Sequence, residues 1–384
     1  MSRRVMVVYG TRPEAIKLAP VVHELQRAPG LAPQVVVTGQ HREMLDQVNT
    51  FFGLIPDLDL DLMSHGSSVN AIARRVLRSM ETLFEEARPD VVVVQGDTIS
   101  AFAASLAGFL AGVPVVHVGA GLRTGNLQSP FPEEANRRLT TVLAALHLAP
   151  TSTARANLER EGTDRASIVV TGNTVVDALH WAVRQPVTFT DPRVAALGQE
   201  RRLVLVTTHR RESWGAPMEE AMAALGEVAE RYPELDFLVP LHRNQLVRDT
   251  VVAALGDMRN VLLTEPLAYA EFAHVMKVSY LVVTDSGGVQ EEAPSLGKPV
   301  LVLRDTTERP EGVRAGTVRL VGTNREDVSR EVERLLTDAA AYASMARAVN
   351  PYGDGRASGR TVAAIRAHLD GTPMPAEFAP ASCE

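Results

Sequence analysis

The sequence predicts an α/β fold made of two doubly wound, Rossmann-like halves. Two observations lead to this prediction. Apolar runs of four to six residues recur along the 384-residue chain and alternate with segments of helical spacing, which is typical of parallel sheets. The alternation also occurs as two series, on either side of a segment at 185–199 that is rich in Pro, Thr and Asp and lacks strong periodicity.

In the first series, short apolar runs predict the strands, and longer amphipathic or Ala-rich segments predict the helices. The expected strands cover 5–9, 34–38, 91–95 and 113–118, and the expected helices cover 13–26, 69–86 and 100–110. The stretch 98–122 contains no charged residue and is long enough to resemble a membrane span. Gly108, Gly112 and Pro114 divide it, so we expect a buried helix that leads into a buried strand.

The second series contains expected strands at 203–207, 236–240, 260–263, 280–284 and 299–303. We expect an N-terminal domain over 1–170 and a C-terminal domain over 171–352. A C-terminal helix at 353–370 is expected to pack back on the first domain. The last segment, 371–384, is rich in Pro and Ala and is expected to be a mobile tail.

Charge and cysteine content exclude several classes of protein. Lys and Arg number 39 against 46 Asp and Glu, so the net charge of −7 argues against non-specific binding of nucleic acid. Cys383 is the single cysteine, which excludes internal disulfides and cysteine zinc sites and fits a reducing cytoplasm. We expect no export signal, because only residues 5–9 are apolar ahead of Gly10.

Polar clusters follow the expected strands, where ligands bind in open parallel sheets. Two glycines in Ser286-Gly287-Gly288 let a ligand approach the backbone at a helix start, which favours a diphosphate. Arg12 and Lys17 lie near another helix start, where basic side chains oppose the helix dipole, and phosphate contact would explain them. The clusters are 10–14, 39–43, 96–98, 119–126, 208–212, 241–244, 284–288 and 304–311.

Three motifs are interpreted as coincidental. The segment 119–124 resembles a dinucleotide fingerprint, but its sixth residue is Thr and prolines follow where a helix should continue. The alternating acids of 57–61 lack the glycine and the closing glutamate of a calcium loop. His209 and Glu212 have no third metal ligand. We therefore predict no redox cofactor and no essential metal.

Seven segments now form a recognisable set: GTRPE at 10–14, QHREML at 40–45, GDT at 96–98, PEEANR at 132–137, THRRE at 208–212, TDSGG at 284–288 and ERPE at 308–311. Together they resemble the non-hydrolysing UDP-N-acetylglucosamine 2-epimerases, in order over residues 4–368. The resemblance implies a fold like the GT-B glycosyltransferases, with two Rossmann-like domains facing across a cleft, usually in a homodimer. It also implies interconversion of UDP-N-acetylglucosamine and UDP-N-acetylmannosamine for surface polysaccharides.

The resemblance also implies binding residues. Arg12 and Lys17 would contact the phosphates or the sugar, and Arg309 the phosphate side. The diphosphate would bind Ser286, Gly287 and Gly288, the ribose hydroxyls would bind Glu292, and Phe272 would lie near the uracil. Leu267 replaces a frequent glutamine, which removes one expected contact with the base. A second, allosteric UDP-N-acetylglucosamine pocket would contain Gln40, Glu43, Arg75, Glu133, Arg210 and His242.

In this family UDP is eliminated to give 2-acetamidoglucal and is then added back with a proton on the other face. Such chemistry needs proton-transfer groups, and Asp97, Glu133 and His209 are the candidates. Each has a structural alternative: Asp97 caps the next helix, Glu133 pairs with Arg137, and His209 is a satisfied loop histidine.

Gly119 departs from the family pattern, which has a glutamate with a proposed proton-transfer or sugar-binding role at this position. Three explanations stay open: a water molecule or Glu133 substitutes, turnover is slow, or the chain binds substrate without turning it over. The function expected is a UDP-N-acetylglucosamine 2-epimerase. The alternatives are a catalytically weak UDP-sugar-binding protein, a GT-B glycosyltransferase and a hydrolysing epimerase. Ser213 replaces a frequent asparagine and can still form hydrogen bonds.

Overall fold

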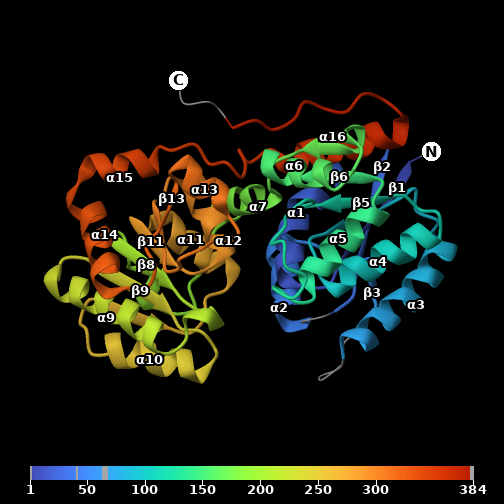
Figure 1. Ribbon diagram of the computed structural model, residues 1–384. Helices are drawn as coiled ribbons and strands as arrows, with labels where there is room; N and C mark the ends of the chain where they lie inside the picture. The colour runs from blue at the N-terminus through green and yellow to red at the C-terminus, as the bar shows by residue number, and fades with distance from the viewer. Residues whose placement is uncertain (1, 40–41, 63–67, 381–384) are drawn as a thin grey trace. The chain divides into compact units, whose positions relative to one another are not determined.

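The computed structural model describes residues 2–39, 42–62 and 68–380, and the chain divides into two compact units (Figure 1). The N-terminal unit comprises 1–178 and 352–379, and the C-terminal unit comprises 179–351 and 380–384. The expected limits were 170 and 352. The first division instead falls inside helix α7 (Thr174–Ala182), so the chain passes between the units as a helix, ahead of the loose segment 185–199.

The described part of the N-terminal unit contains a seven-stranded sheet with the order β3-β2-β1-β4-β5-β6-β7, and all neighbours are parallel. Helix α1 contacts both α2 and α16, and helix α4 contacts both α3 and α5. The strands are β1 (Arg3–Tyr9), β2 (Leu31–Val37), β3 (Leu58–Asp59), β4 (Val91–Gln95), β5 (Val115–Val118), β6 (Leu146–Ala149) and β7 (Ile168–Val170). The helices are α1 (Arg12–Arg27), α2 (Arg42–Phe52), α3 (Val69–Ala87), α4 (Ile99–Leu110), α5 (Glu133–Leu143), α6 (Ser152–Arg160), η1 (Arg165–Ser167) and α16 (Ala357–Asp370).

The C-terminal unit repeats this plan with a parallel sheet of order β10-β9-β8-β11-β12-β13. Its strands are β8 (Leu203–Thr207), β9 (Asp236–Pro240), β10 (Val261–Thr264), β11 (Leu281–Thr284), β12 (Val300–Val302) and β13 (Val318–Leu320). Its helices are α8 (Pro192–Ala195), η2 (Arg211–Ser213), α9 (Ala216–Arg231), α10 (Gln245–Leu255), α11 (Tyr269–Val278), α12 (Gly287–Glu292), η3 (Ala293–Leu296), α13 (Pro310–Ala315), α14 (Arg325–Thr337) and α15 (Ala339–Ala346).

The strand order defines one switch point in each sheet. Strand order reverses between β1 and β4 in the N-terminal unit and between β8 and β11 in the C-terminal unit. Consecutive crossovers leave to opposite faces at such a point, and their loops separate to form a crevice at the carboxyl ends of the strands. The polar segments 10–14 and 96–98 follow the first pair of strands, and 208–212 and 284–288 follow the second pair.

Sheet burial explains why the strand sequences are continuous apolar runs. Both faces of a parallel sheet are covered by helices, so every residue of a central strand is buried. Val91, Val92, Val93 and Val94 of β4 are fully buried, and Leu203 to Val206 of β8 are equally buried.

No helix in the described residues is long and apolar enough to cross a membrane.

The C-terminal segment differs from the expected mobile tail over residues 371–384. Glu377 and Phe378 lie beside β7, where the Phe378 amide donates to the Val170 carbonyl (2.7 Å) and the Val170 amide donates to Glu377 (3.0 Å). Phe378 is 7% exposed and packs with Ala154 and other apolar residues. One aromatic and one acidic residue therefore anchor this Pro-rich segment. Residues 381–384 lie outside the described part of the chain.

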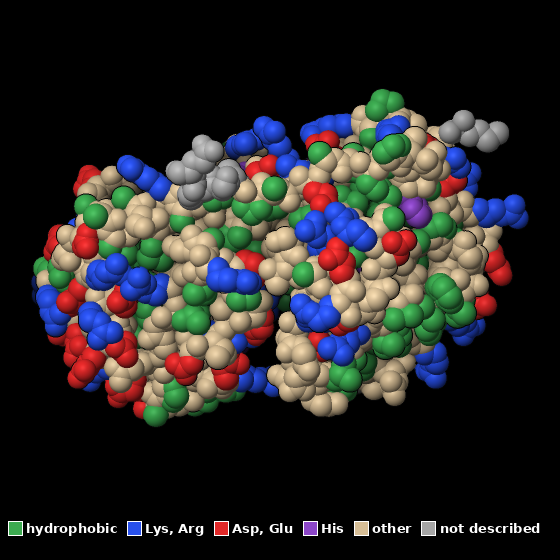
Figure 2. Space-filling view, turned by 45° about the horizontal axis from the view of Figure 1, so that its top comes forward, with side chains coloured by type: hydrophobic (Ala, Val, Ile, Leu, Met, Phe, Trp, Pro, Cys, Tyr) green, Lys and Arg blue, Asp and Glu red, His purple; other side chains and the backbone are tan. Residues whose placement is uncertain are grey.

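The molecular surface carries charges of both signs. On the face shown in Figure 2, Lys and Arg side chains are interspersed with Asp and Glu. A mixed surface with a small net negative charge gives no extended positive field for a polyanion.

Candidate active site

In the N-terminal unit, Glu14 connects the two loops of the switch point. Its Oε2 accepts hydrogen bonds from the Gly10 and Thr11 amides at 2.9 and 2.8 Å. Its Oε1 accepts the Thr98 hydroxyl at 2.5 Å. Burial raises the pKa of Glu14, although these hydrogen bonds oppose the rise. One buried carboxyl group thus fixes the loop that carries Asp97 to the start of α1.

Two cations lie in the first turns of α1. Arg12 is exposed and Lys17 is half-buried, and neither pairs with a carboxylate among the described residues. Cations at a helix N-terminus oppose the helix dipole, and a bound anion would offset that cost. Their predicted role in phosphate or sugar binding stays a prediction.

Asp97 forms an ion pair with Arg137 of α5, whose Nε lies 3.1 Å from Asp97 Oδ2. The Asn136 side chain donates a hydrogen bond to the Asp97 carbonyl at 2.9 Å. The alternative in which Asp97 caps α4 is wrong, because the Thr98 hydroxyl accepts the Ala101 amide at 3.0 Å. Asp97 is therefore oriented by α5.

Glu133 and Glu134 begin α5 in different environments. Glu134 is fully buried, lies 2.9 Å from an Arg137 nitrogen and accepts the Thr124 amide at 3.0 Å. Burial favours a high pKa for Glu134, but the amide hydrogen bonds and Arg137 outweigh it and lower that pKa. Glu133 is partly exposed and has no ion pair among the described residues. The alternative in which Glu133 pairs with Arg137 is therefore wrong, since Glu134 does so.

Gly119 follows β5 with a φ of +76°, a conformation that favours glycine. A Cβ added here would lie 3.1 Å from Gln95 Nε2, so Gln95 occupies the space beside it. His117, two residues earlier, is buried and its Nε2 lies 2.7 Å from the Gly96 carbonyl. In this chain, backbone conformation and a neighbouring amide both oppose a side chain at position 119.

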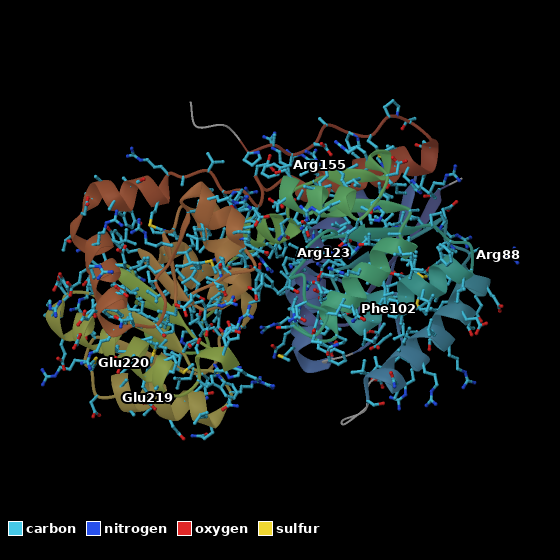
Figure 3. All side chains as sticks on the ribbon, in the orientation of Figure 1. Arg88, Phe102, Arg123, Arg155, Glu219 and Glu220 are labelled. Atoms are coloured by element: carbon cyan, nitrogen blue, oxygen red, sulfur yellow. The ribbon has the colours of Figure 1, made fainter. Side chains whose placement is uncertain are left out.

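In the N-terminal unit, Arg123 follows the same strand (Figure 3). Its Nη2 lies 2.7 Å from Glu161 Oε2 and donates to the Thr141 hydroxyl at 3.0 Å. This buried guanidinium joins the loop after β5 to α5 and α6. Its contacts are structural, and they fix the segment that begins at Gly119.

In the C-terminal unit, Asp285 holds the loop after β8. Its Oδ2 accepts the Thr208 hydroxyl at 3.0 Å and the His209 and Arg210 amides at 2.8 Å each. Its Oδ1 lies 2.8 Å from His209 Nδ1. Burial favours a high pKa for Asp285, but the contact with His209 and the two amides lower it. His209 is thus held by an ionised carboxylate, and the loop-histidine alternative understates its contacts.

Two guanidinium groups lie beside Gly287, the first residue of α12. A Cβ added to Gly287 would be 3.5 Å from Arg210 Nη2 and 3.7 Å from Arg309 Nη2. Arg309 also pairs with the buried Glu291, and Arg210 lies 3.5 Å from Glu308. Arg304 and the neighbouring Arg210 lower the pKa of Glu308 to about 2, against the effect of burial. This arrangement places two guanidinium groups, each paired with a carboxylate, beside the segment 286–288, in which Gly288 is exposed and Gly287 is buried.

Glu292, the last residue of α12, contacts α11. Tyr269 donates a hydrogen bond to Glu292 at 3.4 Å, and burial together with this carboxylate raises the pKa of Tyr269. Glu292 is buried and its Oε2 faces Gly288, where an added Cβ would lie 3.8 Å away. Phe272 is partly buried one turn along α11 from Tyr269.

The residues predicted for the allosteric pocket are divided between the two units, and their shared role stays a prediction. Arg210 and His242 lie with His209 in the C-terminal unit, where the two histidine rings are 6.1 Å apart. Arg75 donates a hydrogen bond to the Leu62 carbonyl at 2.7 Å. Gln40 lies outside the described residues, as does the side chain of Glu43.

Sequence reasoning gave no role to Arg137, Asp285 or Glu14, although each lies in a motif after a strand. Their partners are distant in the sequence: Arg137 and Asp97 are 40 positions apart, and Asp285 and His209 are 76 apart. An acid directly after a buried strand is the available signal for Asp285. Within the described residues, no three His, Cys, Asp or Glu side chains form a group that could hold a metal ion.

Two doubly wound units with polar loops at their switch points define an α/β protein of the GT-B-like class. The family model described as UDP-N-acetylglucosamine 2-epimerase matches residues 23–366, and the chain belongs to this family. The Escherichia coli K12 UDP-N-acetylglucosamine 2-epimerase is 50% identical over 370 residues, which cover 94% of this chain and 98% of the relative. A crystal structure from Listeria monocytogenes has a TM-score of 0.93 at 46% identity and covers 99% of this chain and 100% of its own. The Neisseria meningitidis UDP-GlcNAc 2-epimerase, solved with UDP-GlcNAc bound, has a TM-score of 0.85 at 45% identity and covers 94% and 98%.

Proposed function

We propose that this protein is a UDP-N-acetylglucosamine 2-epimerase that interconverts UDP-N-acetylglucosamine and UDP-N-acetylmannosamine. Family membership over nearly the whole chain is the observation that carries the proposal. The ordered polar segments at both switch points support it, because a nucleotide sugar requires cations for its diphosphate and proton-transfer groups for its sugar.

The chemistry determines the proposed roles. The C2 proton of the sugar is not next to a carbonyl, so direct abstraction is very unfavourable. In the elimination route, a carboxylate base takes the proton from C2, the electrons of the C2–H bond form the C1=C2 bond, and UDP leaves C1 with the electrons of the C–O bond. Re-addition of UDP and of a proton on the opposite face of C2 completes the inversion.

The C-terminal unit supplies groups that suit the leaving UDP. Arg210 and Arg309 flank the glycines after Ser286, and cations placed at a leaving diphosphate stabilise the charge that develops there. We assign Glu292 to the ribose and Phe272 to the base. We thus assign Arg210 to the diphosphate and not to the predicted allosteric pocket.

We assign proton transfer to Asp97, Glu133 and His209. Arg137 orients Asp97 and Asp285 orients His209, while Glu133 is partly exposed at the start of α5. We assign to Glu133 the role of the glutamate that Gly119 replaces. A catalytically weak UDP-sugar-binding protein is the second candidate function, and the absence of a side chain at Gly119 is the observation that favours it.

Incubation with UDP-N-acetylglucosamine in D₂O tests the proposal. We expect UDP-N-acetylmannosamine with deuterium at C2, measured by NMR without any acceptor present. Asp97→Asn and His209→Gln should each lower turnover by about 10²–10⁴-fold, the usual contribution of a positioned proton donor or base. Asp249→Asn, at an exposed position of α10, is the matched control and should keep native turnover.

Other outcomes distinguish the alternatives. Tight binding of UDP-N-acetylglucosamine without exchange at C2 would favour the sugar-binding protein, and a large rise in turnover in Gly119→Glu would then attribute the defect to that position. Stoichiometric UDP with free N-acetylmannosamine indicates a hydrolysing epimerase. Turnover that requires an added acceptor indicates a glycosyltransferase.

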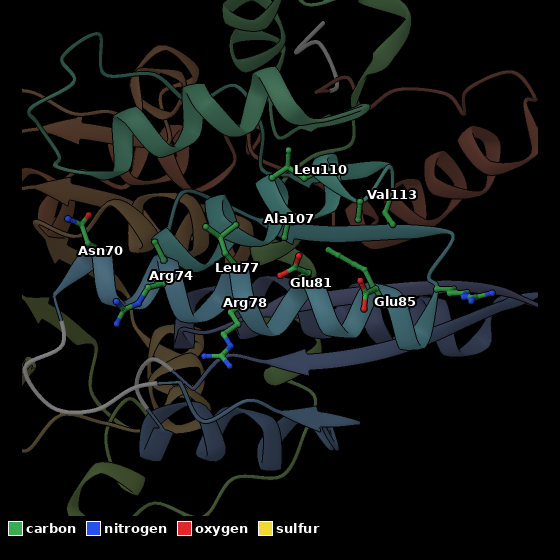
Figure 4. Close-up of a pocket in the computed structure, with 13 residues that line it drawn as sticks. Asn70, Arg74, Leu77, Arg78, Glu81, Glu85, Ala107, Leu110 and Val113 are labelled. Atoms are coloured by element: carbon green, nitrogen blue, oxygen red, sulfur yellow. The ribbon is translucent and has the colours of Figure 1, made fainter.

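We also propose that the protein is a cytoplasmic homodimer. The absence of a disulfide-forming cysteine pair fits a reducing compartment. An exposed apolar face on α4 and α5 supports the dimer, and comprises Phe109, Leu110, Leu139 and Val142, which are 56%, 73%, 48% and 80% exposed. Beside it, a groove of about 1140 Å³ between α3 and α4 contains Leu77 and Ala107 (Figure 4).

A further inference from the structure

The two ring nitrogens of His209 differ in their surroundings. Its Nδ1 lies 2.8 Å from Oδ1 of Asp285, which is completely buried, whereas the His209 side chain as a whole is 41% exposed. A carboxylate has no proton to donate, so the Nδ1 side of this contact carries the hydrogen. The lone pair of the neutral ring, and the second proton of the charged ring, are therefore on Nε2.

Asp285 is held in place by hydrogen bonds besides its contact with the His209 ring. Its other oxygen accepts the Thr208 hydroxyl and the amides of His209 and Arg210, so the carboxylate and the backbone of the loop form one unit. These three donors all lie on the loop after β8, and they hold the carboxylate against rotation away from the imidazole. The ring therefore has a defined orientation as well as a defined tautomer.

We propose that Asp285 is the positioning residue of His209, which keeps the ring protonated at Nδ1 and places Nε2 to donate a proton to the leaving diphosphate oxygen. This inference rests on the proposed function. In the step, the Nε2–H bond breaks and its electrons stay on nitrogen, while the departing UDP oxygen takes the proton as the C1–O bond breaks. In re-addition the same oxygen returns the proton to Nε2.

The charges around the ring agree with an acid rather than a base. The Asp285 carboxylate lies at Nδ1, and Arg210 lies beside Gly287, where the diphosphate is proposed to bind. The ring of His242, after β9, lies 6.1 Å from the His209 ring. Burial and the neighbouring His209 lower the pKa of His242, against the effect of Asp285, so the neutral form of His242 is favoured.

The alkaline limb of the kcat profile tests this assignment. In Asp285→Asn the charge beside the ring is lost, and we expect kcat to fall about 10²-fold or more with the alkaline limb moved to lower pH. The KM for UDP-N-acetylglucosamine should change little, because Asp285 itself is completely buried. A lower kcat with an unmoved limb would overturn the proposal.

Two control variants separate positioning from loop damage. Thr208→Val removes one hydrogen bond to Asp285 and leaves the His209 contact, so the limb should keep its position. Asp177→Asn changes another buried aspartate, which caps α16 through Ala357 and Ser358, and should affect stability alone. In a His209→Gln background, Asp285→Asn should add nothing to the loss of kcat. An additive effect would show that Asp285 acts on the loop and not through the ring.

Histidine ¹⁵N NMR provides a readout that does not depend on turnover. With the His209 signals identified by their loss in His209→Gln, the native protein should contain the Nδ1–H tautomer at high pH, and Asp285→Asn should contain a mixture. This result separates the two proposals, since a protein without epimerase activity can still have the dyad. A native Nε2–H tautomer would refute it directly.

Discussion

At the residue scale, the backbone conformation at position 119 favours glycine. A left-handed φ costs a non-glycine residue about 1–3 kcal/mol, and here the Gln95 amide also lies where a side chain would begin. Glycine therefore fits both the backbone conformation and the neighbouring Gln95 amide at this position. The turnover of Gly119→Glu has to be judged against this cost in stability.

We predict that Gly119→Ala lowers the free energy of unfolding by about 1–3 kcal/mol, measured by denaturant unfolding. Gly53→Ala is the matched control, because Gly53 has a similar φ of +65° and nothing within 4 Å of an added Cβ. The loss at Gly119 should exceed the loss at Gly53, and removal of the amide in Gln95→Ala should abolish the difference. Equal losses at both glycines would contradict the proposed contact.

At the element scale, the long apolar strands could be predicted from the sequence. The expected strands at 91–95, 203–207 and 236–240 agree with β4, β8 and β9 residue for residue. Strands β6 and β13 were not expected, because Leu-His-Leu-Ala and Val-Arg-Leu are short and contain polar residues. Both become strands by pairing with an adjacent parallel strand, which is tertiary information that no local pattern contains.

The candidate site, too, could be predicted only where local sequence patterns reveal it. Its loops could be found because polar segments follow predicted strands. The pairs Asp97–Arg137 and His209–Asp285 could not be found, since each joins elements that are distant in the sequence and meet only when the sheet assembles. The anchored Phe378 was missed for a similar reason, because composition describes the segment and not its partner β7.

Adjacent strands β5 and β6 carry two buried histidines that face in register, His117 and His147. Burial lowers the pKa of His117 to about 3, although the Gly96 carbonyl opposes the shift, and burial also lowers the pKa of His147. The folded chain keeps both neutral where the unfolded chain takes up protons near pH 6.5. Stability contributed by these residues is therefore complete above this pH and is lost as pH falls toward 3.

We predict that the free energy of unfolding falls between pH 7 and pH 5 by up to about 1.4 kcal/mol per pH unit for each histidine. His117→Gln should flatten this dependence, as measured by denaturant unfolding at several pH values. His274→Gln, at a partly exposed position of the C-terminal unit, should leave the slope as it is. An unchanged slope in His117→Gln would argue that this histidine is protonated in the folded chain.

At the scale of the whole molecule, the apolar face of α4 and α5 is left exposed to solvent. Figure 2 shows hydrophobic side chains gathered on the surface of the N-terminal unit, and large exposed apolar patches on soluble proteins mark interaction sites. We propose that a second copy of the chain covers this face. In a twofold-symmetric dimer, each such face would lie against its equivalent.

We predict a homodimer at micromolar concentration by sedimentation velocity, and a monomer for the double variant Leu110→Glu and Val142→Glu. Each glutamate would place a charge inside the proposed contact, where desolvation is costly. Ile55→Glu is the matched control, because Ile55 is also strongly exposed but follows α2, away from this face, so this variant should stay dimeric. Leu110 and Val142 are both strongly exposed, so the monomeric variant should retain the fold. A native monomer would rule out the interface.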